Sequence, residues 1–173
     1  MTVWVKLRVL VACIAIGPIA SAVAAQELNF DIGYTTDCLA VAHGEAGMKA
    51  CIGKAADACM VNTPGGDSTY GMGGCLSAEA DWWDGQLNVA YKALMKREKI
   101  NDAENGAGAG GPQSAATALR DLQRAWIGFR DATCAYEYAQ WGGGTGGGPA
   151  SVGCFMRLTG EQALYLQTAG FGG

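Results

Sequence analysis

The sequence predicts an all-α protein, a small bundle of helical hairpins joined by about three disulfides. Apolar residues recur at three- and four-residue steps in several segments, which is the spacing of one face of a helix. No segment shows sustained alternation of apolar and polar residues, the pattern of a half-buried strand. Beyond a leader-like start, six cysteines remain. An even number of cysteines in an exported chain is typical of paired disulfides.

Residues 1–25 have the pattern of a secretory signal peptide. Lys6 and Arg8 give a positive start, Val9–Ile19 is an apolar run of 11 residues, and small residues end the segment. The run is too short to span a bilayer, so no membrane span is expected after cleavage. Cys13 lies in a sequence like a lipoprotein cleavage box, but too close to Arg8, and we expect it to leave with the leader. The expected location is periplasmic or secreted.

Residues 26–69 predict a cysteine-containing helical hairpin that extends the N-terminal side of the main domain. An irregular lead-in precedes a short helix that begins at Thr35 and stops near Gly44. A second helix is expected over Ala46–Val61, where apolar residues have helical spacing. Asn62–Gly74 is rich in Gly, Asn and Pro, so we expect a break made of turns there.

The cysteines of this extension admit several pairings, of which we favour one. Cys51 and Cys59 are eight residues apart on one predicted helix, about 12 Å at 1.5 Å per residue, which is too far for a bond. A hairpin between the two predicted helices places Cys38 opposite Cys51. We therefore favour the pair Cys38–Cys51, and Cys59–Cys75 by elimination.

A long helix is predicted over Leu76–Lys99. Its apolar seam repeats in alternating steps of three and four, as in packed helix pairs, and consists of Ala80, Trp83, Leu87, Ala90 and Leu94. Acidic residues gather toward its start and basic residues toward its end, an order that suits the helix dipole. The acidic ones are Glu79, Asp81 and Asp84.

Asn101–Pro112 is expected to be a flexible connector to the next helix, which is capped by Ser114 and runs to about Trp141. The side of this helix expected to pack carries Leu119, Leu122, Trp126, Phe129 and Thr133. The side expected to face water carries Arg120, Gln123, Arg124, Arg130 and Asp131.

A glycine run at Gly142–Gly148 separates this helix from a last one over Ala150–Thr168. The disulfide Cys134–Cys154 would join the two helices across the loop. The run resembles a phosphate-binding loop only in glycine content, because no Lys-Ser/Thr follows it and no strand precedes it. We therefore expect no nucleotide site.

Composition and motifs favour contact over catalysis. Without Lys6 and Arg8, the 12 Lys and Arg residues fall to 10 against 16 Asp and Glu residues, a net charge of −6, which argues against nucleic acid as a partner. His43 is the one histidine and no Cys-x-x-Cys pair occurs, so neither a metal nor another cofactor is expected. Asp81 and Asp84 could form a carboxylate pair, but such pairs on the polar side of a helix are usually solvated. We expect no enzyme.

Residues of about 70–168 resemble the lysozyme inhibitor LprI-like N-terminal domain family. The order of motifs that carries the resemblance is Cys75, Trp83-Asp84, Leu87-Asn88, Tyr91, Gln123, Trp126, Phe129-Arg130, Cys134 and Cys154. This chain has Gln162 in a region where the family often carries an Arg. The resemblance implies a small exported helical domain over 70–173, some relatives of which inhibit lysozyme.

The resemblance makes lysozyme, or another basic envelope protein, the expected partner. Animal lysozyme is basic and has a cleft lined by carboxylates, so an acidic protein would be steered toward it. The disulfide-joined glycine loop could enter such a cleft, and its candidate partner-binding residues are Tyr138, Trp141, Gly143, Thr145 and Gly146. The alternative is a structural or stress-protection protein of the cell envelope without a dedicated enzyme target.

Overall fold

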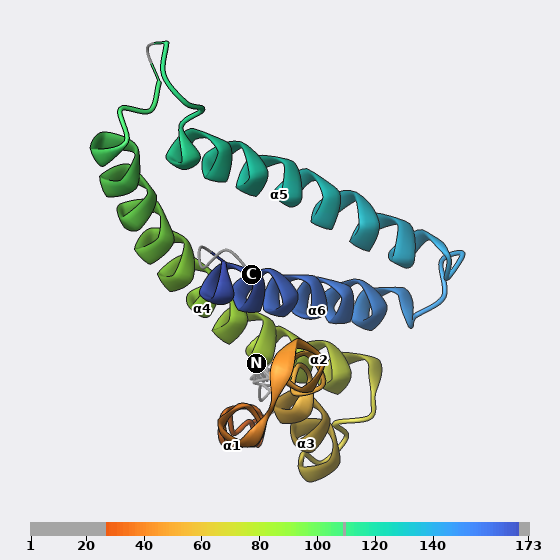
Figure 1. Cartoon of the computed structure of the whole chain (residues 1–173). Coiled ribbons are helices and arrows are strands. Elements are labelled where there is room, and N and C mark those ends of the chain that lie inside the picture. The colour runs from red at the N-terminus through yellow and green to blue at the C-terminus, as the bar shows by residue number, and fades with distance from the viewer. Residues whose placement is uncertain (1–26, 109, 170–173) are drawn as a thin grey trace, which may run out of the picture.

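The computed structural model describes residues 27–108 and 110–169, and within these ranges the chain forms six α-helices and no strand (Figure 1). The helices are α1 Gly33–Val41, α2 Gly44–Lys49, α3 Lys54–Asn62, α4 Thr69–Glu104, α5 Ala115–Ala139 and α6 Gly147–Thr168. This architecture confirms the all-α prediction. The predicted signal peptide lies outside the described residues.

The 36-residue helix α4 is the element on which the others are assembled. Helix α6 packs along α4 and also against α5, with α5 and α6 side by side and antiparallel (Figure 1). The three short helices gather at the N-terminal end of α4, where α3 contacts α4 and α2 contacts α6. The bundle therefore has a long-helix layer and a separate cap of short helices at one end.

The seam predicted for α4 is the centre of the core. Trp83, Leu87 and Leu94 are buried, and they form one cluster with residues of α6, including Ala163 and Leu164. The neighbouring Trp82 is partly buried and meets Trp83 edge to face, with ring centroids 4.7 Å apart. Burial of these large apolar side chains supplies most of the driving force for packing α4 on α6.

The three predicted disulfides are confirmed. Their Cα–Cα distances are 5.6 Å for Cys38–Cys51, 5.7 Å for Cys59–Cys75 and 5.4 Å for Cys134–Cys154, all within the usual range. The first joins α1 to the turn before α3, the second joins α3 to α4, and the third joins α5 to α6. Each therefore joins segments that are close in sequence, at separations of 13, 16 and 20 residues.

The single helix predicted over Ala46–Val61 is wrong, because a turn divides it into α2 and α3. Gly53 ends that turn with φ = 97°, a left-handed conformation that breaks the helix and that other residues rarely adopt. A side chain at Gly53 would also lie 3.3 Å from the terminal methyl group of Met156. The apolar periodicity continues across the break, so it did not reveal the turn.

Glu79 binds the start of α3, a role that its predicted place among the acidic residues near the start of the long helix did not indicate. Its side chain is fully buried and accepts four hydrogen bonds. The donors are Thr35 Oγ1 at 2.9 Å, Gly53 N at 2.8 Å, Ala56 N at 2.7 Å and Trp83 Nε1 at 3.0 Å. Thr35 Oγ1 in turn accepts from the backbone N–H of Ala55 at 3.0 Å. Residues distant in sequence thus satisfy N–H groups that the start of a helix leaves unpaired.

The break predicted over Asn62–Gly74 is shorter than expected. Helix α4 already begins at Thr69, and Ser68 caps it by accepting a hydrogen bond from Gly71 N at 3.0 Å. A side chain at Gly71 would lie 2.3 Å from the carbonyl oxygen of Gly65. Gly71 therefore allows two backbone segments to approach closely. It lies within α4 and does not form a turn.

The connector after α4 is also shorter than predicted, and α5 begins as expected. Ser114 caps α5 by accepting from Thr117 N, which confirms that prediction. The Asp102 carboxylate accepts from Ser114 Oγ and from the backbone N–H groups of Ala115 and Ala116. These hydrogen bonds, led by that from Ser114, lower the pKa of Asp102. The end of α4 and the start of α5 are thereby linked.

The packed side of α5 differs from the predicted one. Leu122 and Phe129 are 38% and 59% exposed, whereas the Arg130 side chain is only 19% exposed and Gln123 is half-buried. The true seam is Ala116, Leu119, Gln123, Trp126, Arg130 and Cys134. Its steps of three and four place a polar residue at two packed positions. A prediction from hydropathy assigns polar residues to the solvent side of a helix. It therefore placed Gln123 and Arg130 on the exposed side of α5.

No helix within the described residues combines the length and the apolar character that crossing a bilayer requires.

The buried Glu79 network generates the first prediction. Glu79→Ala should lower the free energy of unfolding by about 3 kcal/mol or more, because it leaves several buried donors without an acceptor. Asp81→Ala, at an exposed position of the same helix, should change it by less than about 0.5 kcal/mol. Urea unfolding of the oxidised proteins, followed by circular dichroism, measures both values. Equal stability of the two variants would contradict the role given to Glu79.

Candidate partner-binding surface

The loop between α5 and α6 is a series of tight turns. Trp141 N donates to Tyr138 O at 3.2 Å, Gly144 N donates to Trp141 O at 2.8 Å, and Gly147 N donates to Gly144 O at 3.1 Å. Gly142 and Gly143 have φ values of 54° and 88°, which glycine adopts without steric cost. The glycine run therefore forms a defined, hydrogen-bonded loop and not an extended linker.

Two aromatic rings lie against the backbone of this loop. A side chain at Gly146 would come within 2.1 Å of Trp141 Cζ3, and one at Gly147 would come within 3.2 Å of the Tyr138 ring. Trp141 and Tyr138 are each 53% exposed, so one side of each residue is packed and the other faces solvent. We call Tyr138, Trp141 and residues 142–146 the aromatic tip. The structure thus brings together all five predicted partner-binding residues, and their role in binding stays a prediction.

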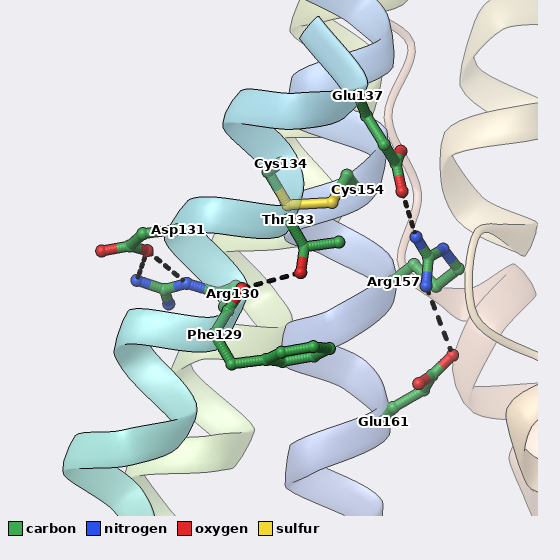
Figure 2. The surroundings of a disulfide bond; sticks show 9 residues. All are labelled: Phe129, Arg130, Asp131, Thr133, Cys134, Glu137, Cys154, Arg157 and Glu161. Atoms are coloured by element: carbon green, nitrogen blue, oxygen red, sulfur yellow. Dashed lines mark hydrogen bonds and ion pairs between the residues drawn. A yellow bond between two sulfur atoms is a disulfide. The ribbon is translucent and has the colours of Figure 1, made fainter.

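The base of the aromatic tip is held by a disulfide and an ion-pair bridge. Cys134–Cys154 joins α5 to α6, and Arg157 reaches from α6 to Glu137 on α5 (Figure 2). The distance from Arg157 Nη2 to Glu137 Oε1 is 2.7 Å, and Arg157 Nη1 lies 3.9 Å from Glu161 Oε1. These partly exposed charges contribute modestly, so the covalent bond is the main constraint on the tip.

Arg130 packs between two aromatic rings below the disulfide. Its guanidinium carbon is 4.9 Å from the centroid of the Trp126 ring and 5.0 Å from that of Phe155, distances suited to a cation–π interaction. Arg130 and Asp84 line the same small pocket but do not form an ion pair with each other. Arg130 binds Asp131 at 2.8 Å, and Asp84 instead accepts a hydrogen bond from Asn88 at 2.8 Å.

Gln162 of α6 forms an uncharged hydrogen bond with Gln123 of α5. Its Nε2 donates to Oε1 of Gln123 at 3.1 Å, and Gln162 is buried between α5 and α6. This amide pair links α5 to α6. The motif residue Gln123 therefore has a packing role in this chain.

The carboxylate pair considered for catalysis lies at a small pocket. Asp81 and Asp84 line a small pocket of about 300 Å³ together with Arg130 and Phe155. His43 precedes α2 without a side-chain capping bond. Among the described residues, no group of three or more His, Cys, Asp or Glu side chains could hold a metal ion.

Sequence reasoning missed a groove between the N-terminal ends of α4 and α6. It has a volume of about 660 Å³ and is lined by Leu28, Thr69, Tyr70, Gly73, Gly74, Ser77, Gly148, Pro149 and Val152. The clustering of glycines on both helices was visible in the sequence, but it was read as a signal for turns. Only the packing of α4 on α6 brings the two glycine clusters together.

The packing of the Trp141 ring on Gly146 generates the second prediction. Gly146→Ala should displace the indole, because the added methyl group would overlap it at 2.1 Å. The matched control is Gly148→Ala, whose new methyl group meets no atom within 4 Å. The Trp141 indole N–H signal in a ¹H–¹⁵N spectrum should shift in the first variant only. An unchanged signal in Gly146→Ala would contradict the described loop.

The third prediction concerns the disulfide at the base of the tip. Replacing Cys134 and Cys154 together by Ala opens a loop with a sequence separation of 20. The free energy of unfolding should fall by roughly 3 kcal/mol, since the unfolded chain regains the freedom that the bond removed. Chemical denaturation of the variant and of the parent protein, with the other two disulfides intact, measures this difference. Coincident denaturation curves would contradict it.

Comparison with known proteins gives a family. A family model described as "Lysozyme inhibitor LprI" matches residues 59–166. The chain is 29% identical over 160 residues to an uncharacterized 17.7 kDa protein in the puhA 5′ region of Rhodobacter capsulatus, covering 92% of this chain and 94% of that protein. It is 31% identical over 84 residues to an uncharacterized protein of Rhizobium meliloti strain 1021, covering 49% and 60% of the two chains. No solved structure gives a significant match.

The matched residues contain α4, α5, all but the last two residues of α6, the aromatic tip and the disulfides Cys59–Cys75 and Cys134–Cys154. Helices α1 and α2 and the disulfide Cys38–Cys51 are not spanned by the match. Because the match covers more than half of the chain, this protein belongs to the lysozyme inhibitor LprI family.

Proposed function

We propose that this protein is a non-catalytic inhibitor of a lysozyme-type muramidase and that it acts by contact with the enzyme cleft. Family membership over residues 59–166 is the observation that carries the proposal. The aromatic tip supports it, since it lies inside the matched region and exposes two aromatic side chains.

The aromatic tip has the physical properties of a binding element. Exposed Trp and Tyr side chains are enriched among residues that dominate binding energies. The turns, the glycine contacts and the Cys134–Cys154 bond hold the tip in one conformation. A preorganised loop loses little conformational entropy on binding, which favours affinity.

The charge of the chain favours a basic partner. The net charge of −6 beyond the leader would attract a strongly basic enzyme over a distance of about one Debye length, ~10 Å at moderate salt. Such attraction mainly raises the association rate and weakens as salt increases. Salt dependence is therefore part of the expected behaviour.

The compartment agrees with this role. Three disulfides are typical of proteins that fold outside the reducing cytoplasm. We assign the mature protein to the periplasm or the secreted fraction, where it would meet a muramidase that attacks the cell wall. The pattern of residues 1–25 supports export.

The fourth prediction tests the function at the tip. Trp141→Ala should weaken inhibition of an animal lysozyme by about 2 kcal/mol, or about 30-fold in the inhibition constant, as for a central aromatic contact. The control is Tyr165→Ala, which removes an aromatic side chain of α6 that is 51% exposed and outside the tip. Turnover of cell-wall substrate is measured with oxidised protein at low and at physiological salt.

Undiminished lysozyme turnover with stoichiometric parent protein at both salt concentrations would remove the proposed function. The alternative role, a structural or stress-protection protein of the envelope, would then be favoured. Equal inhibition by the Trp141 and Tyr165 variants would retain the function but exclude the tip as its centre.

A further inference from the structure

The groove between α4 and α6 is lined by glycines from both helices as well as by side chains. Gly74 is covered by Leu28, whose Cδ1 would lie 2.9 Å from a side chain at that position. Gly73 and Gly148 are open, since a Cβ atom added at either would meet nothing within 4 Å. Tyr70 stands at the groove and is largely exposed. The lining is therefore a shallow apolar hollow between helices, with unfilled space above two glycines.

Charge is distributed unevenly along the chain, and the groove lies at the end of the bundle formed by the acidic segment. Residues 27–88, which form α1–α3 and the first half of α4, contain nine carboxylates, of which Glu79 is buried, and two lysines, a net charge of −7. Residues 89–125 contain six basic and four acidic side chains, a net charge of +2. Six of the nine groove residues belong to the acidic segment. An apolar hollow with an acidic surround complements a protruding apolar side chain on a basic surface.

The groove is also continuous with the aromatic tip along the chain. Gly147 lies under the Tyr138 ring, and the next two residues, Gly148 and Pro149, line the groove. Both features thus meet at the start of α6. A single partner could contact both without any change in the arrangement of the helices.

We infer that this groove is a second contact site for the basic muramidase, and that it receives an apolar side chain flanked by Lys or Arg on the enzyme surface. This inference rests on the proposed function and adds the N-terminal end of the bundle to the interface. The tip supplies aromatic contacts, and the groove supplies a hollow in the most acidic part of the molecule. Their combination would orient the partner, which neither could do alone.

The test fills the groove without disturbing the fold. Gly73→Leu places a side chain in the open space, and Gly85→Leu makes the same change on α4 where no atom lies within 4 Å and outside the groove lining. Both replace a helical glycine, so both should keep or raise helix stability. Binding of an animal lysozyme is measured by calorimetry, and its turnover is measured in parallel. Gly73→Leu should weaken binding about tenfold or more, as expected for loss of a central contact, and Gly85→Leu should not.

Two substitutions that each remove one negative charge test the contribution of the acidic end of the molecule. Asp67→Asn, just before α4, should slow association with lysozyme at low salt, whereas Glu104→Gln, at the other end of α4, should have a smaller effect. Circular dichroism and thermal unfolding of all four variants exclude misfolding as the cause. Equal effects of the two substitutions would contradict the part given to charge.

The outcomes separate the two proposals. Unchanged binding by Gly73→Leu would overturn the groove site and leave the proposed function intact. Binding that Gly73→Leu weakens, without inhibition by the parent protein, would support the groove and overturn the inhibitory function. No binding by the parent protein would overturn both, and a dimer of the parent that Gly73→Leu dissociates would assign the groove to a second copy of this chain.

Discussion

The buried carboxylate of Glu79 joins the short helices to the long one, and the geometry of the acidic end depends on it. Its oxygens accept hydrogen bonds from α1, from the start of α3 and from Trp83 within α4. A carboxylate in the interior is tolerated only when donors surround it, so all these elements must be in place together. The Cys59–Cys75 bond reinforces the same junction covalently. The groove and its acidic surround lie at this end of the molecule.

The α5–α6 loop presents aromatic side chains to solvent and holds them in one conformation. Glycines let the Trp141 and Tyr138 rings pack directly on the backbone, where a methyl group at Gly146 would not fit. The Cys134–Cys154 bond and the Arg157–Glu137 pair hold the two helices below. These contacts and bonds hold the aromatic tip in one conformation, at the surface where we propose contact with a partner.

Several features could be predicted because they depend on local pattern. The long apolar seam of α4 has the period of a helix, and each cysteine pairs with one that is close in sequence, at separations of 13, 16 and 20 residues. The Ser114 cap follows from the ability of its hydroxyl group to accept a backbone N–H bond. The side of α5 could not be predicted from hydropathy, because Arg130 is packed by stacking on Trp126 and Phe155. The break at Gly53 was hidden because apolar residues continue on both sides of it.

By itself the sequence determined the helical class, the six cysteines available for disulfides, the acidic charge and the family motifs, since each follows from residue types and their spacing. The tertiary structure alone decided what the glycines and Glu79 do. Gly71, Gly73 and Gly146 look alike in the sequence, yet one permits close backbone packing, one leaves an open hollow and one seats an indole ring. The physical reason is that these roles are set by atoms from distant segments, and no local pattern records which segments will meet.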